Sequence, residues 1–184
     1  MAERVCPVWI GYFLLSPLRK LAQDPYKILM PYVKNGTTVM DTGSAMGYFS
    51  LPMADLVGDT GKVYCIDLQQ GMIDKLQKRA HKKGLASRIE ARKCNADSLL
   101  INDLSGKLDF ALAFAMVHEV PDPKRLLSEI YASLKPGGKL LIAEPGGHVS
   151  ETDFQQTLKL ALDCGFQVSE RPSIAKSLSV ELTK

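Results

Sequence analysis

Apolar residues in this chain fall into seven short runs and four longer amphipathic stretches. The short runs are rich in β-branched and apolar residues and are bounded by glycine, proline or asparagine, which is typical of strands. The longer stretches repeat apolar residues at helical spacing: within 71–83, Met72, Ile73, Leu76 and Ala80 share one side and basic residues the other. The predicted strands are 37–41, 62–67, 88–94, 108–115, 139–143, 166–170 and 175–182. The predicted helices are 47–58, 71–83, 123–134 and 151–165. Asp122 and Ser150 are the expected N-caps of the last two, and 135–138 is expected to form a turn.

The order of these elements predicts the architecture. Strands that alternate with helices form a parallel sheet with right-handed crossovers and helices on both faces. Only a short link separates the last two strands, so we expect them to form an antiparallel pair at one edge. No internal repeat or second domain is visible. We therefore expect one α/β domain over 1–184, a Rossmann-like three-layer fold, with 1–34 as a helical N-terminal extension.

The N-terminal extension carries its own signals. Ser16 and Asp24 each precede a proline, as an N-cap precedes a first helical residue, so short helices are expected before Met30. This segment either closes over a binding site as a lid or merely covers a sheet edge or a helix face. Its apolar run at 5–15 lacks a small-x-small cleavage site and is far shorter than the roughly 20 residues of a membrane span. We expect a cytoplasmic protein that is not inserted in a membrane.

Composition and charge add few constraints. The 184 residues are 46% hydrophobic and 23% charged, with a formal net charge of +3, as in an ordinary globular domain. The densest basic run, 75–83, lies on a predicted helix and is best interpreted as a solvated face, so a nucleic-acid partner is not expected. The cysteines show no CxxC or metal-ligand spacing, which favours reduced thiols and no bound metal. They are Cys6, Cys65, Cys94 and Cys164.

The stretch 37–50 predicts a strand, a tight turn and the start of a helix. Gly43 and Gly47 allow backbone angles that a Cβ forbids, and they let a ligand approach the main chain closely. A strand-turn-helix unit of this kind binds nucleotides in open α/β sheets, at the carboxyl ends of the strands. The sequence therefore predicts a nucleotide-type ligand at this edge.

Two carboxylates narrow the choice of nucleotide. Asp41 ends the first strand just before Gly43, where it disfavours a pyrophosphate and suits an ammonium group. Asp67 ends the second strand, twenty residues after Gly47, where a carboxylate can accept both hydroxyls of a ribose. A ligand with a ribose, an amino-acid end and no phosphate is S-adenosylmethionine. An NAD(P)-dependent oxidoreductase, the alternative, would need a fuller glycine motif without Asp41.

Four segments together resemble the signature motifs of class I S-adenosylmethionine-dependent methyltransferases. They are Asp41-Thr-Gly-Ser-Ala-Met-Gly47, Asp67, Ala96-Asp97 and Leu134-Lys-Pro-Gly-Gly-Lys-Leu-Leu-Ile-Ala-Glu-Pro145. The resemblance extends from Thr37 to the C-terminus. It implies a seven-stranded sheet whose last strand is antiparallel, and S-adenosylmethionine as the cofactor.

The resemblance also implies roles for individual residues. The methionine end would contact the glycine turn, the ribose the end of the second strand, the adenine the end of the third, and the sulfonium the end of the fourth. The expected cofactor-binding residues are Asp41, Gly43, Ser44, Ala45, Gly47, Asp67, Leu68, Asn95, Ala96, Asp97, Ala115 and Met116. Ala45 departs from the family pattern, which has glycine there, and we expect binding to survive this change. Asp97 has a second interpretation, as the N-cap of a short segment at 98–104.

Candidate catalytic residues follow the fourth strand. His118 and Glu119 are the polar titratable pair beside the expected methyl group, and His118 could act as a base near neutral pH. Alternatively, His118 simply belongs to the turn at the strand end. His148, after the fifth strand, is a weaker candidate of the same kind. We expect a small-molecule methyl acceptor; a non-catalytic S-adenosylmethionine-binding module and an RNA methyltransferase are the alternatives.

Overall fold

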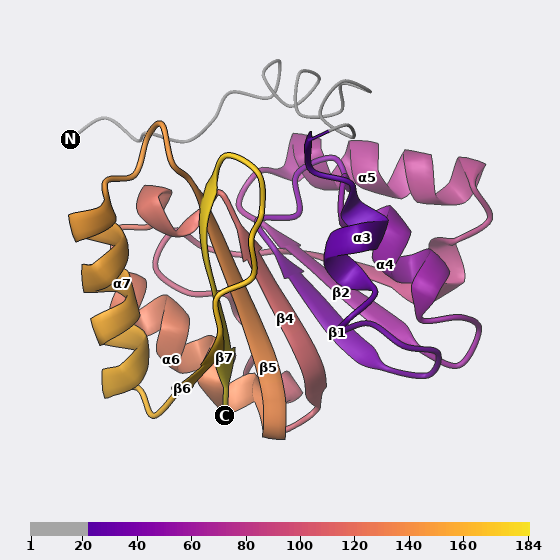
Figure 1. The fold of residues 1–184 in the computed structure, drawn as a ribbon. Coiled ribbons are helices and arrows are strands. Elements are labelled where there is room, and N and C mark those ends of the chain that lie inside the picture. Colours follow the sequence, from indigo (N-terminus) through magenta and orange to yellow (C-terminus); the bar gives the residue numbers. More distant parts are fainter. Residues whose placement is uncertain (1–21) are drawn as a thin grey trace.

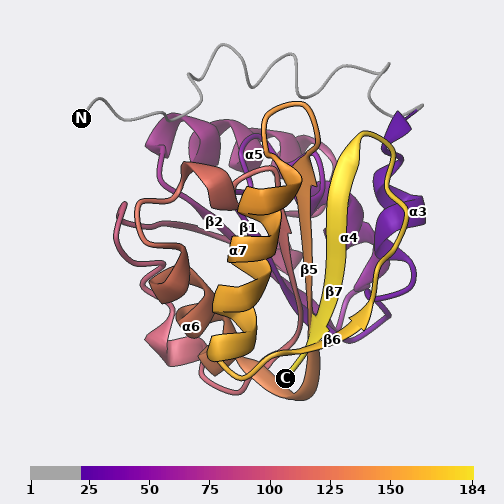
Figure 2. The same ribbon diagram turned by 60° about the vertical axis from the view of Figure 1, so that its left-hand side comes forward.

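The computed structural model describes residues 22–184 as a seven-stranded sheet between two layers of helices (Figures 1 and 2). The strands are β1 (Thr38–Thr42), β2 (Lys62–Asp67), β3 (Ile89–Lys93), β4 (Leu108–Phe114), β5 (Leu134–Pro145), β6 (Gln167–Glu170) and β7 (Ser177–Thr183). The helices are α3 (Pro25–Leu29), α4 (Ser50–Leu56), α5 (Gln70–Lys82), α6 (Pro123–Ser133) and α7 (Glu151–Asp163), with short 3-10 turns η1 (Ala86–Arg88), η2 (Asn102–Leu104) and η3 (Val117–Glu119). The predicted three-layer α/β fold is confirmed.

The sheet has the order β3-β2-β1-β4-β5-β7-β6. All neighbouring strands are parallel except β7, which is antiparallel to both β5 and β6, so the predicted antiparallel last strand is confirmed. The order reverses between β1 and β4, which lie side by side. Such a switch point opens a crevice at the carboxyl ends of the two strands, where ligands bind in sheets of this kind.

Each face of the sheet is covered by its own helices. Helices α3, α4 and α5 pack on one face, to the right in Figure 1, and α6 and α7 pack on the other. Successive residues of β4 alternate between the two layers: Phe110 belongs to the first and Ala111 to the second. Because β4 is buried on both faces, it is apolar almost throughout its length. This rigid centre carries the strand ends discussed below.

Three helix N-caps stabilise the chain where the sequence predicted them. The side chains of Asp24, Asp122 and Ser150 accept hydrogen bonds from backbone N–H groups in the first turns of α3, α6 and α7. Ser16, the other expected cap, lies outside the described residues, as do the aromatic residues of 1–21. Within 22–184, no helix is long and apolar enough to cross a membrane.

Three segments differ from the sequence prediction. Helix α4 begins at Ser50 rather than Gly47, because residues 45–49 form a turn in which Ala45 has a φ of 45°. Residues 135–138, expected as a turn, lie inside β5, because Gly137 N donates to Lys184 O at 2.9 Å and Gly138 O accepts from Lys184 N at 3.0 Å. The segment 98–104 contains only the short turn η2, so it has no helix for Asp97 to cap.

The described cysteines pack as ordinary thiols. Cys65 and Cys94 are buried in the sheet region, and Cys164 is partly exposed, with no disulfide between them. Burial raises the pKa of the Cys94 thiol to about 11, so this group stays neutral at physiological pH. Residues 22–184 contain no cluster of three or more histidine, cysteine or acidic side chains that could hold a metal ion.

Candidate functional site

The turn after β1 is folded back onto the next strand. Gly43 and Gly47 have φ angles of 71° and 82°, which only glycine adopts without strain. The N–H groups of Gly43 and Ser44 both donate to Ile66 O, at 2.9 and 3.0 Å. These two bonds fix the turn against the carboxyl end of β2, where Asp67 follows.

Asp67 fastens the turn from the neighbouring strand. Its Oδ2 accepts from Ala45 N and its Oδ1 from Gln69 N, both at 2.8 Å. The residue is 9% exposed, and burial raises the pKa of its carboxyl above the ordinary value of 3.8, partly offset by these N–H donors. Each oxygen keeps acceptor capacity for a ribose hydroxyl. The geometry fits the predicted role of Asp67.

The same bonds show which ligand the turn does not suit. The N–H groups of Gly43, Ser44 and Ala45 are committed to β2, and Gly47 N donates to Ser44 O at 2.9 Å. A pyrophosphate needs free N–H groups in such a turn. Four N–H groups of this turn are already hydrogen-bonded, and the Asp67 carboxylate lies beside them. The turn therefore favours a cofactor without phosphate.

Asp41 lies beneath the turn rather than at its surface. It is 3% exposed, and its Oδ2 accepts a hydrogen bond from Ser50 Oγ at the start of α4. In the sheet register it pairs with Cys65, two residues before Asp67, so both acids point to the same face. Its contact with the ammonium group of the cofactor remains a prediction.

Two buried hydroxyls at the turn fit a polar ligand. Thr42 Oγ1 and Ser44 Oγ have no hydrogen-bond partner, although their residues are only 1% and 4% exposed. Unpaired buried hydroxyls are unfavourable unless a ligand or water bonds them. They lie beside the glycines that the amino-acid end of S-adenosylmethionine would contact, so their unused hydrogen-bonding capacity fits a polar ligand there.

The end of β4 closes over the turn. A Cβ added at Gly43 would lie 3.0 Å from Met116 Cβ, so the predicted residues Gly43 and Met116 are in direct contact. Ala115 takes a φ of 55° and donates its N–H to Ala143 O at 2.7 Å, which bends the chain from β4 into η3. The structure thus brings Met116 to the glycine turn, and its expected place near the sulfonium remains a prediction.

The expected adenine segment follows β3. Asn95 N donates to Ser98 O at 2.9 Å, while the Asp97 side chain is 73% exposed and lies 3.8 Å from Arg125 of α6. Glu129 of α6 binds this segment through hydrogen bonds, a role that the sequence did not predict. Its carboxylate accepts from Ser98 Oγ at 2.8 Å and from the N–H of the next residue at 2.6 Å. Adenine contacts by Asn95, Ala96 and Asp97, and a cofactor contact by Leu68 after β2, remain predictions.

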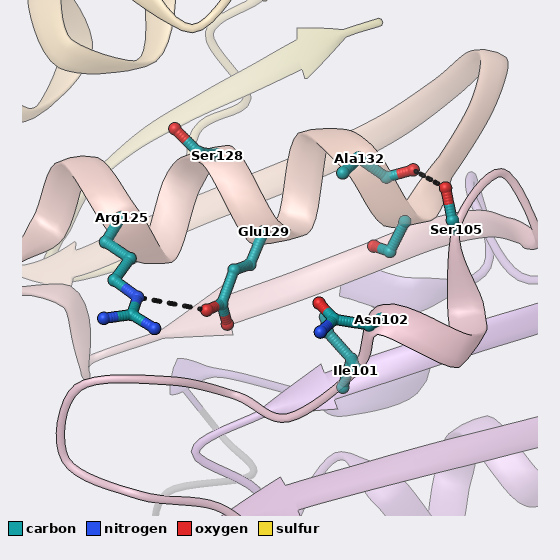
Figure 3. Close-up of a pocket in the computed structure, with 8 residues that line it drawn as sticks. Ile101, Asn102, Ser105, Arg125, Ser128, Glu129 and Ala132 are labelled. Carbon is teal, nitrogen blue, oxygen red and sulfur yellow. Dashed lines mark hydrogen bonds and ion pairs between the residues drawn. The ribbon is translucent and has the colours of Figure 1, made fainter.

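A cavity of about 300 Å³ lies behind this segment, between α6 and η2 (Figure 3). None of the predicted cofactor residues lines it. In Figure 3, Arg125 bonds Glu129 along the helix and Ser105 reaches back to the carbonyl of Ala132. The side chains around this cavity hold the connection between β3 and β4 against α6, whereas the predicted cofactor site lies elsewhere, at the carboxyl ends of the strands.

The predicted catalytic residues lie on η3. His118 Nδ1 contacts Glu144 Oε2 at the end of β5, and Glu144 Oε1 accepts from Val117 N at 2.8 Å. Glu144 is 1% exposed, whereas 29% of the His118 side chain is exposed. Glu119 is half-buried on the same turn, and His148 is exposed after β5. Sequence reasoning singled out His118 but missed its buried partner.

Comparison with known proteins identifies the family. A family model described as a methyltransferase domain matches residues 33–175, most of the chain. The chain belongs to this methyltransferase family. Membership confirms the resemblance seen in the sequence: the protein is an enzyme of the class I type, with S-adenosylmethionine as its cofactor. It also decides against the NAD(P)-dependent alternative.

Individual relatives agree with this assignment. The ubiquinone/menaquinone biosynthesis C-methyltransferase UbiE of Pseudoalteromonas translucida is 33% identical over 112 residues, which cover 61% of this chain and 44% of that protein. UbiE of Escherichia coli K12 is 30% identical over the same shares. The match therefore spans less than half the length of these relatives. An S-adenosylmethionine-dependent methyltransferase from Aquifex aeolicus has a TM-score of 0.85 at 26% identity, covering 97% of this chain and 99% of that one.

Ala45 gives a direct test of the turn. Its left-handed φ disfavours an L-residue by roughly 1–2 kcal/mol, while a glycine there would add entropy to the unfolded chain. We expect Ala45→Gly to change the free energy of unfolding by less than about 1 kcal/mol. Because Ala45 N already reaches Asp67, the Kd for S-adenosylhomocysteine should change by less than about threefold, as measured by calorimetry. A tenfold tighter Kd would show that the methyl group obstructs the ligand.

Proposed function

We propose that this methyltransferase methylates a small hydroxylated molecule at an electron-rich carbon, with His118 as the base. The two curated relatives described above are named C-methyltransferases of quinone biosynthesis, which supports a carbon acceptor. An enol or phenol carbon becomes nucleophilic when its hydroxyl loses a proton, so such an acceptor requires a base beside the methyl group.

The position of η3 is the observation that carries this proposal. Met116 touches Gly43 of the cofactor turn, and His118 follows it two residues later on the same short turn. In this proposal the imidazole lies beside the bound cofactor, on the side of the β4 and β5 strand ends. The described hydrogen bonds of His118 involve Nδ1 alone, which leaves Nε2 to face an acceptor.

The described end of the N-terminal extension supports a site closed on the side of β7. Gln23 Nε2 donates to Ala175 O at 3.1 Å and to Ser177 Oγ at 3.2 Å, and Gln23 O accepts from Tyr48 Oη at 2.9 Å. This residue thus links the turn after β1 to the start of β7. We propose that the extension as a whole acts as a lid that keeps water from the reacting groups.

The reaction divides between cofactor and protein. S-adenosylmethionine supplies a methyl group on a positively charged sulfur that leaves as a neutral thioether. His118 Nε2 takes the proton from the acceptor hydroxyl as the acceptor carbon bonds the methyl group and the sulfur leaves. When the substituted carbon loses its own proton to solvent, the acceptor oxygen takes the first proton back from His118, which restores the neutral base. The glycine turn and Asp67 would hold the cofactor, and alignment of a methyl group with the acceptor carbon is a major part of the rate gain in such a transfer.

The proposal predicts separate effects on catalysis and on binding. In a screen of hydroxylated aromatic and enolic acceptors with methyl-labelled cofactor, the protein should label carbon. His118→Gln should lower kcat for that acceptor by about 10²–10⁴-fold, the usual contribution of a general base. Its Kd for S-adenosylhomocysteine should stay within about twofold. His81→Gln, an exposed histidine on α5, is the matched control and should leave both values unchanged.

Two results would contradict this proposal. Labelling of RNA but of no small acceptor would place the enzyme in another substrate class. Full activity of His118→Gln would remove the assigned base and return His118 to a purely local role at the strand end.

A further inference from the structure

The pair formed by His118 and Glu144 has a geometry that fixes which imidazole nitrogen carries the proton. Glu144 ends β5, and its carboxylate is almost fully buried against η3. One oxygen accepts from Val117 N at 2.8 Å and the other faces His118 Nδ1. A buried carboxylate needs such partners, because an unpaired charge away from water is strongly unfavourable.

The two bonds act on different parts of the turn. The bond to Val117 N fixes the backbone of η3, since it joins the carboxylate to the residue directly before His118. The bond to Nδ1 acts on the ring. A carboxylate only accepts hydrogen bonds, so Nδ1 has to be the nitrogen that carries hydrogen. In the neutral ring the second nitrogen, Nε2, then carries the lone pair.

We propose that Glu144 is a positioning residue, which holds His118 as the Nδ1–H tautomer and thereby makes Nε2 the proton acceptor. This inference rests on the proposed function for its catalytic consequence, but its structural part does not. Residues 22–184 offer Glu144 no ion-pair partner other than His118. The carboxylate is therefore dedicated to the turn and the ring, and the proton that Nε2 receives from the acceptor is stabilised by the negative charge behind it.

Glu144→Gln tests the inference because the carboxamide can donate a hydrogen bond to His118 Nδ1, whereas the carboxylate can only accept one. The carboxamide oxygen would stay on Val117 N, since an NH₂ group there would face another donor. The NH₂ group would then donate to His118 Nδ1, and the ring proton would move to Nε2. The shape of the side chain is unchanged, so the fold should survive while the base is lost.

The tautomer can be read directly. Long-range ¹H–¹⁵N NMR on protein with ¹⁵N-labelled histidine distinguishes the two tautomers at a pH where the ring is neutral. The chain has only three histidines, so the His118→Gln spectrum identifies the signal of His118. We expect the Nδ1–H tautomer in the unsubstituted protein and the Nε2–H tautomer in Glu144→Gln. Glu170→Gln, on the exposed strand β6, is the matched control and should leave the spectrum unchanged.

Kinetics completes the test. Glu144→Gln should lower kcat about 10²–10⁴-fold with little change in the Kd for S-adenosylhomocysteine, because a wrong tautomer cannot accept the proton. The inference is overturned by an Nε2–H tautomer in the unsubstituted protein, a result that needs no variant to fold. It is equally overturned if the tautomer stays the same in Glu144→Gln, or switches without loss of kcat. If the unsubstituted protein methylates no acceptor, that result contradicts the proposed function instead. The NMR result then tests only whether Glu144 sets the tautomer of His118.

Discussion

Asp67→Asn is expected to weaken binding of S-adenosylmethionine by about 10²–10³-fold, the loss of one or two hydrogen bonds to a charged acceptor at about 1.5–3 kcal/mol each. Both Asp67 oxygens accept backbone N–H groups, so the NH₂ of asparagine must face either Ala45 N or Gln69 N, donor against donor. The variant therefore disturbs the turn as well as the ribose contact. Calorimetric titration with S-adenosylmethionine and S-adenosylhomocysteine measures the change.

The matched control is Asp74→Asn, which removes the same charge from an exposed position on α5. It should leave both Kd values unchanged. If Asp67→Asn also binds within threefold of the unsubstituted protein, then the ribose is held elsewhere and the assigned site is wrong.

The pH dependence of binding follows from the raised pKa of Asp67. The ionised carboxyl accepts the ribose hydroxyls, so affinity should fall as the pH is lowered from about 7 through this raised pKa. The contribution of this group to the free energy of unfolding depends on pH in the opposite direction. A carboxyl pKa raised by folding means that the folded state binds the proton more tightly, so this group destabilises the protein increasingly as the pH rises from the ordinary value of 3.8 to the raised pKa, and no further above it. In Asp67→Asn, the part of the pH dependence of Kd that is due to this group should disappear.

Gly61→Ala is expected to have the largest effect on stability, lowering the free energy of unfolding by about 2–4 kcal/mol. A Cβ at this position would lie 2.4 Å from Val57 Cβ and 2.6 and 2.7 Å from the carbonyl oxygens of Val57 and Thr37. Two of these three atoms are backbone, so the contact cannot be relieved by rotating a side chain. The end of α4 or the start of β2 has to move.

Thermal unfolding measures this effect, as a fall in Tm of roughly 5–15 °C for a domain of this size. Gly147→Ala is the control, because a Cβ there meets no atom within 4 Å and its backbone angles are ordinary. An equal Tm for Gly61→Ala and the unsubstituted protein would mean that the α4–β2 connection is looser than the structure shows.

The sequence was most informative where a local signal decides the outcome. Strand β2 begins and ends at the predicted residues, because an apolar run between Gly61 and the acidic end of the strand leaves no other register. The capping side chains of Asp122 and Ser150 were predicted from their own neighbours along the chain. The start of α4 was not, because the turn at 45–49 is held by bonds to β2, and those become visible only in three dimensions.

The same distinction holds for the candidate site: local signals in the sequence identified some of its residues, and contacts seen only in three dimensions revealed the others. Asp67 was identified by its spacing from the glycines, whereas Glu129 and Glu144 act on residues 26 to 31 positions away. The sequence of α6 gave no sign that Glu129 binds the segment after β3. For Glu144 a signal was present: a carboxylate at the end of an otherwise apolar strand has to find a partner when it is buried. From this signal, the contact between Glu144 and His118 could have been predicted from the sequence.

The four bonded N–H groups of the glycine turn also bear on competition inside the cell. ATP shares the adenine and ribose of S-adenosylmethionine and could offer the same hydroxyls to Asp67. Its triphosphate, however, would meet a turn whose Gly43, Ser44, Ala45 and Gly47 donors are already used, with negative charge nearby. We therefore expect the turn to disfavour ATP without any blocking side chain, so selectivity for S-adenosylmethionine would follow from the backbone alone.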